Sequence, residues 1–381
     1  MARPDQLTKT TLFQAGEHGY TTYRIPAIVA TARGAVLAFC SARRGRGGDW
    51  DRNDIVLRRS DDGGETWSEM VVLASHPEQV VDNPTPIAAE DGTVHFLYQE
   101  HYARVYYTRS DDDGRTFSPP TEITATFDAF RAEYDWKVVA PGPGHAIELR
   151  HGPYQGRLVV PIWLCQPDPT IPGGDHRPSC MATIYSDDQG RTWHRGEIVA
   201  NTSEHVLHPS EHTAAQLADG RVMLNIRSET PIHRRLVTTS PDGATGWEPP
   251  FFDDALYEPV CFGSLLRLQH QAPELGNDLL LFSNPDSRHR TEYFNRMNFR
   301  ARENLTVKLS RDGGRTWPIA RVIEPGIAGY SDLAEGPDGT IFCLFEGGAA
   351  GGPYRGNQYV ACARFGLPWL MALGPNGGRT P

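Results

Sequence analysis

A repeated motif constrains the fold of this 381-residue chain more than any other feature: Ser-x-Asp-x-Gly-x-Thr followed by an aromatic residue. Complete copies begin at Ser60, Ser110, Ser186 and Ser310, and a degenerate copy begins at Ser240. Their starts are separated by 50, 76, 54 and 70 residues, which leaves room for one four-stranded sheet and a variable loop per copy. Such a period indicates an array of similar units rather than several unrelated domains.

The composition of the motif is typical of a tight turn. In the first copy, Asp62 is placed to accept backbone N–H groups, and Gly64 permits a positive φ. The closing Trp67 is predicted to pack between neighbouring sheets. We therefore predict that the aspartates of the motif are structural and not catalytic. The ligand spacing of a calcium-binding EF-hand loop is absent.

Short apolar or alternating runs lie before and between the copies and predict β-strands. These runs are 54–60, 94–98, 105–110, 157–161, 222–226, 279–282, 305–310 and 341–345. Five copies, with a sixth sheet closed by the two ends of the chain, predict an all-β, six-bladed β-propeller of four-stranded antiparallel sheets. We predict a single domain over 1–381, with an ordered core at about 12–366 and short polar tails.

Composition excludes several classes of function. The net charge of −10 and the absence of a long basic run argue against binding to nucleic acid, although an anionic small substrate stays allowed. No run approaches 18 apolar residues, so no membrane span is predicted. The six cysteines lack CxxC spacing, and no metal site is predicted. The polar segment 1–11 lacks the apolar run of a signal peptide, which favours a cytoplasmic protein; a secreted protein that has lost its leader is the alternative.

The motif resembles the Asp box of sialidases. Ahead of the first copy, Tyr23-Arg24-Ile25-Pro26 resembles the Tyr-Arg-Ile-Pro signature of the same family. The resemblance spans about residues 23–346 and is closest to the compact single-domain sialidases of bacteria and of the animal cytosol. It implies a retaining exo-α-sialidase that releases terminal sialic acid from a sialylated glycan without a metal or organic cofactor. The oligomeric state is not predicted.

Sialic acid carries a carboxylate on its anomeric carbon, and guanidinium groups match a carboxylate bidentately while staying charged at any relevant pH. The resemblance implies three such groups, Arg24, Arg227 and Arg302. Arg296 and Arg300 are alternatives to Arg302 because they lie close to it in the chain.

The resemblance also implies a tyrosine nucleophile, Tyr330, activated by Glu211. Most glycosidases use a carboxylate in this role, and sialidases are an exception. A carboxylate would be repelled by the one that the anomeric carbon of sialic acid already bears, whereas a neutral phenol is not. The family more often has Ser-Gln or Cys-Gln where this chain has His212-Thr213, so Glu204 is kept as an alternative to Glu211.

The implied general acid is Asp49, in a glycine-rich loop just before a predicted strand. It would protonate the leaving oxygen and later deprotonate the attacking water. Asp51 and Asp54 are alternatives within the same segment.

Four further residues complete the predicted site. By resemblance, Arg43 lies near the 4-hydroxyl of the sugar, Asn83 lies in the substrate pocket, and Glu346 orients the first arginine. Trp163 either lines the pocket or packs in the core.

Two other functions are compatible with the same fold. A transglycosylating or intramolecular trans-sialidase would use the same residues, with 165–178 and 283–300 as candidate acceptor-side segments. A non-catalytic Asp-box propeller that serves as a binding module is the second. The presence together of Tyr330, Glu211, Asp49 and the three arginines favours an enzyme, because a binding module has no chemical need for all six.

Overall fold

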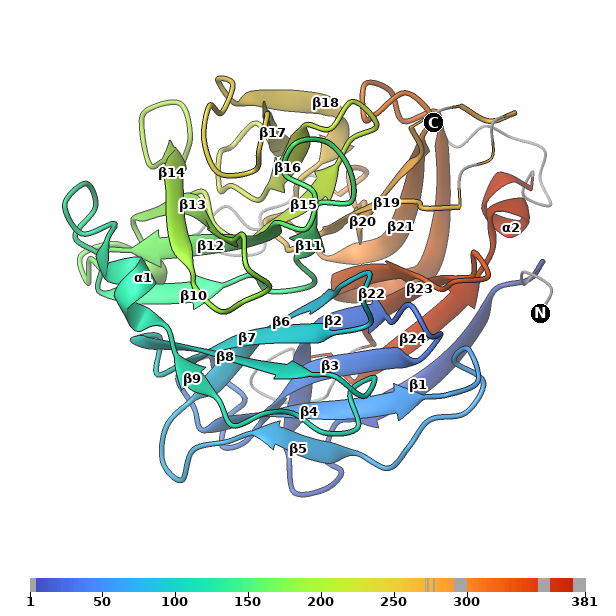
Figure 1. Ribbon diagram of the computed structural model, residues 1–381, viewed down its shortest axis with the longest axis horizontal. Helices are drawn as coiled ribbons and strands as arrows, with labels where there is room; N and C mark the ends of the chain where they lie inside the picture. Colours follow the sequence, from blue (N-terminus) through green and yellow to red (C-terminus); the bar gives the residue numbers. More distant parts are fainter. Residues whose placement is uncertain are drawn as a thin grey trace.

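The computed structural model describes residues 5–270, 272, 274–276, 278–290, 300–348 and 357–372. Within these residues nearly all of the regular secondary structure is β-strand. The helices described are short: α1 (Thr124–Asp128), the 3₁₀ helix η1 (Gly174–His176) and α2 (Leu367–Met371). Figure 1 shows the sheets following one another in chain order around a common centre, from blue through green and yellow to red. The all-β, propeller-like arrangement predicted from the repeats is thereby confirmed.

Three antiparallel sheets contain four strands each, and neighbouring strands in each sheet are consecutive in the chain. The first is formed by β2 (Thr22–Ala30), β3 (Val36–Arg43), β4 (Asn53–Ser60) and β5 (Val71–Ala74). The second is formed by β6 (Val81–Ala88), β7 (Val94–Glu100), β8 (Arg104–Ser110) and β9 (Thr121–Glu122). The third is formed by β15 (His212–Gln216), β16 (Val222–Ile226), β17 (Arg234–Ser240) and β18 (Phe251–Tyr257).

A fourth sheet has the order β10-β12-β13-β14, with β11 paired to β12 beside it. Its strands are β10 (Val138–Pro141), β11 (Ile147–Glu148), β12 (Leu158–Cys165), β13 (Ser179–Ser186) and β14 (His194–Asn201). The seven strands of the remaining sheet are β19 (Ser264–Arg267), β20 (Leu280–Pro285), β21 (Glu303–Ser310), β22 (Ile319–Glu335), β23 (Ile341–Gly347), β24 (Tyr359–Phe365) and β1 (Thr8–Gln14).

The seven-stranded sheet contains a strand with two sets of neighbours. The first part of β22, residues 319–327, pairs with β21, and the second part, residues 328–335, pairs with β23. At the other edge β1 pairs with β24, so the two ends of the described chain meet in one sheet (Figure 1). This pairing agrees with the prediction that the two termini close the last sheet.

Each copy of the repeated motif forms the turn between the third and fourth strands of its sheet, as between β4 and β5. In the first copy Asp62 Oδ1 accepts hydrogen bonds from the backbone N–H of Glu65 at 3.1 Å and of Thr66 at 2.9 Å. Side-chain and backbone hydrogen bonds from Thr66 lower the pKa of Asp62 to about 2. Gly64 has φ +81°, and a Cβ there would lie 2.9 Å from the ring of Phe342. The predicted turn geometry is confirmed, and only glycine fits this position without strain.

The hydrophobic core lies between neighbouring sheets. Phe39 of β3 stacks on Phe96 of β7, with ring centroids 4.9 Å apart. The closing aromatic of the third motif, Trp193, packs edge-on against Tyr107 of the preceding sheet at 5.5 Å. Packing of this kind fixes the angle between sheets and therefore where their inner strands converge.

One buried carboxylate joins several inner strands at the centre. Asp332 of β22 accepts hydrogen bonds from the backbone N–H of Ile28 at 2.9 Å, from His145 Nδ1 at 2.7 Å and from Ser264 Oγ at 2.8 Å. Ile28 and His145 belong to two other sheets or their connections, whereas Ser264 belongs to β19 of the same seven-stranded sheet. Because Asp332 lies two residues after Tyr330 on the same strand, these bonds also fix the position of Tyr330.

All six cysteines are buried and form no disulfide bond with one another. Within the described ranges, the structure has no helix of the length and apolar character needed to cross a membrane.

Candidate active site

A pocket of about 670 Å³ lies where the inner strands of the sheets converge. It is lined by nine of the ten residues predicted from the sequence: Arg24, Arg43, Asp49, Asn83, Trp163, Glu211, Arg227, Arg302 and Tyr330. These residues come from every sheet of the fold, so the chain brings them together only when the sheets pack around the centre. The tenth residue, Glu346, lies behind the lining and is fully buried.

Tyr330, in β22, presents its phenol to the pocket and contacts two charged side chains there. Its Oη donates to Glu211, lying 2.6 Å from Oε1 and 2.7 Å from Oε2, and accepts a hydrogen bond from Arg227 Nη1 at 2.6 Å. Arg227 also forms a close ion pair with Glu211. Burial raises the pKa of Tyr330 far above its ordinary value, and the cation of Arg227 only partly opposes this. The phenol is therefore neutral in the free protein, with a carboxylate ready to accept its proton.

Three guanidinium groups surround this phenol. The Arg24 guanidinium lies 5.2 Å and that of Arg302 lies 5.3 Å from the centre of the Tyr330 ring, while Arg227 contacts its oxygen. Arg227 and Arg24 are each paired with a carboxylate, Glu211 and Glu346, and all three guanidinium-bearing residues still line the pocket. The arrangement is therefore suited to bind a carboxylate directly above the tyrosine.

Glu346, in β23, connects Arg24 to Tyr330. Its carboxylate accepts hydrogen bonds from Arg24 Nε at 3.1 Å, from the backbone N–H of Ile25 at 2.9 Å and from that of Tyr330 at 3.1 Å. Burial acts to raise the pKa of Glu346, but Arg24 and these N–H donors outweigh it and lower the pKa. Ile25 has φ +55°, a strained conformation for a β-branched residue, at an irregularity in the β2–β3 pairing. Glu346 stabilises this bend, which points Arg24 into the pocket.

Asp49 also lines the pocket, from the loop between β3 and β4. Its Oδ1 accepts a hydrogen bond from Arg43 Nη1 at 2.6 Å, and its side chain is 45% exposed. Burial favours a higher pKa, but the cations of Arg43 and Arg24 outweigh it and hold the pKa of Asp49 well below its usual range. Arg43 is itself buried and also binds Asp82 at 3.2 Å. The carboxylate is thus held at a fixed place but stays open to the pocket.

Asn83 and Trp163 both line the pocket. Asn83 has φ +61° at an irregularity in the β6–β7 pairing, which resembles the bend at Ile25. Trp163, in β12, is 5% exposed and packs on Tyr102 and His176. The ring is packed on other rings and also forms part of the pocket wall, and its contact with a substrate stays a prediction.

The residues kept as alternatives have other environments. Asp51 reaches the pocket wall, but its Oδ2 caps the backbone N–H of Arg46 and of Gly48. Asp54 accepts hydrogen bonds from Tyr20 and Arg44 away from the pocket, and Glu204 is exposed in a loop outside it. Arg300 contacts His233 and does not line the pocket, and Arg296 lies outside the described residues.

Several lining residues were not predicted from the sequence. They are Trp50, Tyr102, His176, Arg177 and Glu229, together with Asp82, which contacts Arg43 from behind the wall. Asp82 and Trp50 directly neighbour predicted residues in the chain, and that proximity was an available signal. The others lie in connections between two strands of the same sheet, namely β7–β8, β12–β13 and β16–β17, and no motif marks them.

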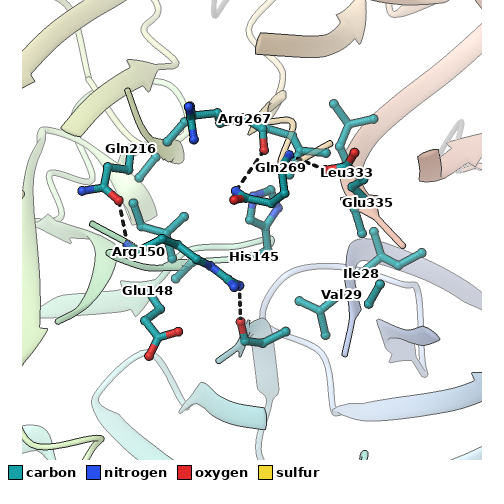
Figure 2. Close-up of a pocket in the computed structure, with 18 residues that line it drawn as sticks. Ile28, Val29, His145, Glu148, Arg150, Gln216, Arg267, Gln269, Leu333 and Glu335 are labelled. Atoms are coloured by element: carbon teal, nitrogen blue, oxygen red, sulfur yellow. Dashed lines mark hydrogen bonds between the residues drawn. The ribbon is translucent and has the colours of Figure 1, made fainter. Parts of the chain in front are cut away.

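A second, smaller pocket of about 120 Å³ lies toward the other end of the inner strands. On β2, Arg24 lines the first pocket and residues 28–30 line the second. Figure 2 shows hydrogen bonds among some of the lining residues, as where Gln216 Oε1 accepts from the backbone N–H of Arg150 at 2.7 Å. None of the ten residues predicted for the site lines this pocket.

Comparison with known proteins gives consistent results. The BNR repeat-like domain family matches residues 34–343. The chain is 31% identical to a sialidase of Micromonospora viridifaciens over 96% of this chain and 55% of that protein, and 30% identical to sialidase-2 of Mus musculus over 91% and 94%. It spans little more than half of the first of these relatives and 62% of a sialidase of Bacteroides fragilis.

Solved structures agree in fold. The Hadza microbial sialidase Hz136 is similar with a TM-score of 0.76 and 26% identity, over 96% of this chain and 69% of that one. A leech intramolecular trans-sialidase is similar with a TM-score of 0.76 at 15% identity, over 95% and 71%, which is a likeness of fold. With Asp-box turns at the outer edges of the sheets and arginines around a tyrosine in the pocket, the chain belongs to the sialidase family.

Proposed function

We propose that the protein is an exo-α-sialidase that hydrolyses terminal α-linked sialic acid from glycoconjugates with retention, through a tyrosyl-glycosyl intermediate. The observation that carries the proposal is the phenol of Tyr330, which donates to Glu211, accepts from Arg227 and lies within a ring of three guanidinium groups. The substrate class follows from the three guanidinium groups, because they are suited to bind a carboxylate at the reacting carbon.

The first step is binding of the carboxylate by Arg24, Arg227 and Arg302. Charge-assisted hydrogen bonds to a guanidinium are short and strong, and a bidentate pair also fixes orientation. Binding here puts the anomeric carbon over the oxygen of Tyr330. The geometry supplies proximity and alignment before any bond changes.

In the second step the oxygen of Tyr330 attacks the anomeric carbon while the bond to the leaving oxygen breaks. The phenolic proton passes to Glu211, whose two carboxylate oxygens are both within 2.7 Å of the phenol oxygen. The cation of Arg227 stabilises charge that develops on that oxygen. A neutral phenol in the ground state avoids repulsion by the substrate's own carboxylate.

Asp49 donates a proton to the leaving oxygen in the same step, and this requires its pKa to rise when substrate binds. Arg43 and Arg24 depress the pKa of Asp49 in the free protein. A substrate carboxylate on Arg24 neutralises part of that positive charge, and the sugar covers the exposed carboxyl group; both effects favour the protonated form. Water then attacks the intermediate, Asp49 takes its proton, and Glu211 returns the phenolic proton to Tyr330. Two displacements at one carbon give net retention.

The proposal also includes the number of blades in the propeller. We propose six blades of four strands, with β22 serving as the outer strand of one blade through residues 319–327 and as the inner strand of the next through 328–335. A single catalytic domain and a cytoplasmic location are further parts of the proposal.

The test is hydrolysis of a fluorogenic α-sialoside by the parent, Tyr330→Phe and Asp49→Ala, on both N-acetyl and deaminated substrates. Tyr154→Phe and Asp111→Ala are matched controls outside the pocket. Turnover by the parent and controls with a loss of at least about 100-fold in the two site variants supports the proposal. Absence of turnover by a folded parent would instead favour a binding propeller. Proton NMR of the first product distinguishes retention from inversion, and an anhydro sugar would indicate intramolecular transfer.

A further inference from the structure

Trp50 directly follows the proposed acid in the chain. Among the described residues, several large apolar side chains are well exposed, and Trp50 is the one of them that lines the pocket. Its exposed fraction is 42%. An exposed indole at the edge of a polar pocket costs solvation free energy unless a ligand covers it. Nothing in the proposed mechanism uses this ring.

The indole is held in place by aromatic contacts. Its ring lies 4.8 Å from Tyr102, 5.5 Å from His176 and 5.9 Å from His101, measured between centroids. Tyr102 is 4% exposed, so the indole rests on a buried ring. A side chain already fixed in this way loses little conformational entropy when a ligand stacks on its open surface.

The loop that carries Trp50 is also fixed at its base. Asp51 accepts hydrogen bonds from the backbone N–H of Arg46 at 2.8 Å and of Gly48 at 2.9 Å, and Asn53 Nδ2 donates to the Gly48 carbonyl at 3.3 Å. Consecutive Cα atoms are about 3.8 Å apart. Asp49 and Trp50 both line the pocket, so the group whose oxygen Asp49 protonates enters the same pocket as the indole.

We propose that Trp50 is the binding platform for the first sugar ring of the leaving group. This inference rests on the proposed function. A pyranose presents an apolar C–H face, and the face of an indole, with its negative quadrupole, is a suitable partner for such a surface. Trp50 then binds the sugar next to the bond that breaks, whereas the three arginines bind the sialic acid itself. A methyl leaving group is too small to cover the indole.

The experiment compares kcat/KM for sialyllactose and for methyl α-sialoside in the parent, Trp50→Ala and Trp50→Phe. We expect Trp50→Ala to lower kcat/KM for sialyllactose about tenfold, equivalent to ~1.4 kcal/mol, through a rise in KM. The loss for methyl α-sialoside should be less than about threefold, and Trp50→Phe should recover most of the sialyllactose activity. Tyr154→Ala, which removes an exposed aromatic outside the pocket, should leave the ratio of the two substrates unchanged.

The possible failures can be told apart. If Trp50→Ala lowers kcat/KM equally for both substrates, the ring serves only to position Asp49. The inference is then overturned while the proposed function stands. If kcat/KM is unchanged for both substrates, the inference is likewise overturned. If the folded parent hydrolyses neither substrate, the proposed function fails and the inference fails with it.

Discussion

The phenol oxygen of Tyr330 lies 2.6 Å and 2.7 Å from the two carboxylate oxygens of Glu211. The two residues are separated by 119 positions in the chain and belong to different sheets. Their contact is what turns a buried tyrosine, with a pKa raised by burial, into a candidate nucleophile.

Replacement of Glu211 by glutamine should remove the acceptor for the phenolic proton while keeping the shape of the side chain. We expect kcat to fall by roughly 10²–10⁴-fold, with a smaller change in KM. Steady-state kinetics on a fluorogenic sialoside measure both. Glu204→Gln is the matched control, because Glu204 is exposed and lies outside the pocket. A loss of activity in the control and not at Glu211 would reassign the base.

Replacement of Arg24 by lysine keeps the charge but removes the planar fork that binds a carboxylate. It also removes one of the hydrogen bonds to Glu346. We expect KM to rise roughly 10- to 100-fold, in line with the loss of a charge-assisted hydrogen bond. Arg33→Lys, at a half-exposed arginine that pairs with the buried Asp113 outside the pocket, should show parental kinetics. An unchanged KM in Arg24→Lys would argue against a carboxylate at this place.

Removal of an Asp-box carboxylate should affect stability and not catalysis. Asp62→Ala leaves the backbone N–H groups of Glu65 and Thr66 without their acceptor, and we expect unfolding to become easier by about 1–3 kcal/mol. Asp111→Ala, at the exposed and variable second position of the second motif, should change the free energy of unfolding by less than about 0.5 kcal/mol. Denaturant titration gives both values. Loss of kcat in folded Asp62→Ala would contradict a purely structural role.

Acid should destabilise the protein partly through His95, which is fully buried and bonded to Tyr107 at 2.8 Å. Burial lowers the pKa of His95 to about 4, compared with 6.5 in an unfolded chain. Between these pH values the unfolded chain binds a proton that the folded protein does not, so stability is lost as the pH falls from about 6.5 to about 4. The loss from this residue is about 3 kcal/mol.

The variant His95→Gln should therefore show a flatter dependence of unfolding free energy on pH across this interval. Denaturant titrations at pH 7, 6, 5 and 4 measure the slope. His194→Gln, at an exposed histidine, provides the control and should keep the parental slope. An unchanged slope in His95→Gln would mean that other groups account for the acid lability.

Local patterns predicted the strands and turns well because both depend on neighbouring residues. The strand predicted at 222–226 has the same bounds in β16, and that predicted at 105–110 is one residue longer in β8 (Arg104–Ser110). The run at 157–161 was predicted too short, since β12 continues to Cys165. Its last residues, including Trp163, are buried by contacts with neighbouring strands that no local pattern contains.

The sequence by itself determined the repeat and the turn chemistry of each motif, and it predicted nine of the residues that line the pocket. Only the tertiary structure decided which of them touch: Glu211 rather than Glu204 reaches Tyr330, and Asp49 rather than Asp54 reaches the pocket. It also revealed Trp50 and Asp82 as parts of the site. The physical reason is that a turn is closed by hydrogen bonds a few residues apart, whereas the site forms where inner strands from all the sheets converge. That convergence is set by the packing between sheets and by the bonds of Asp332, which join residues as far as 304 positions apart.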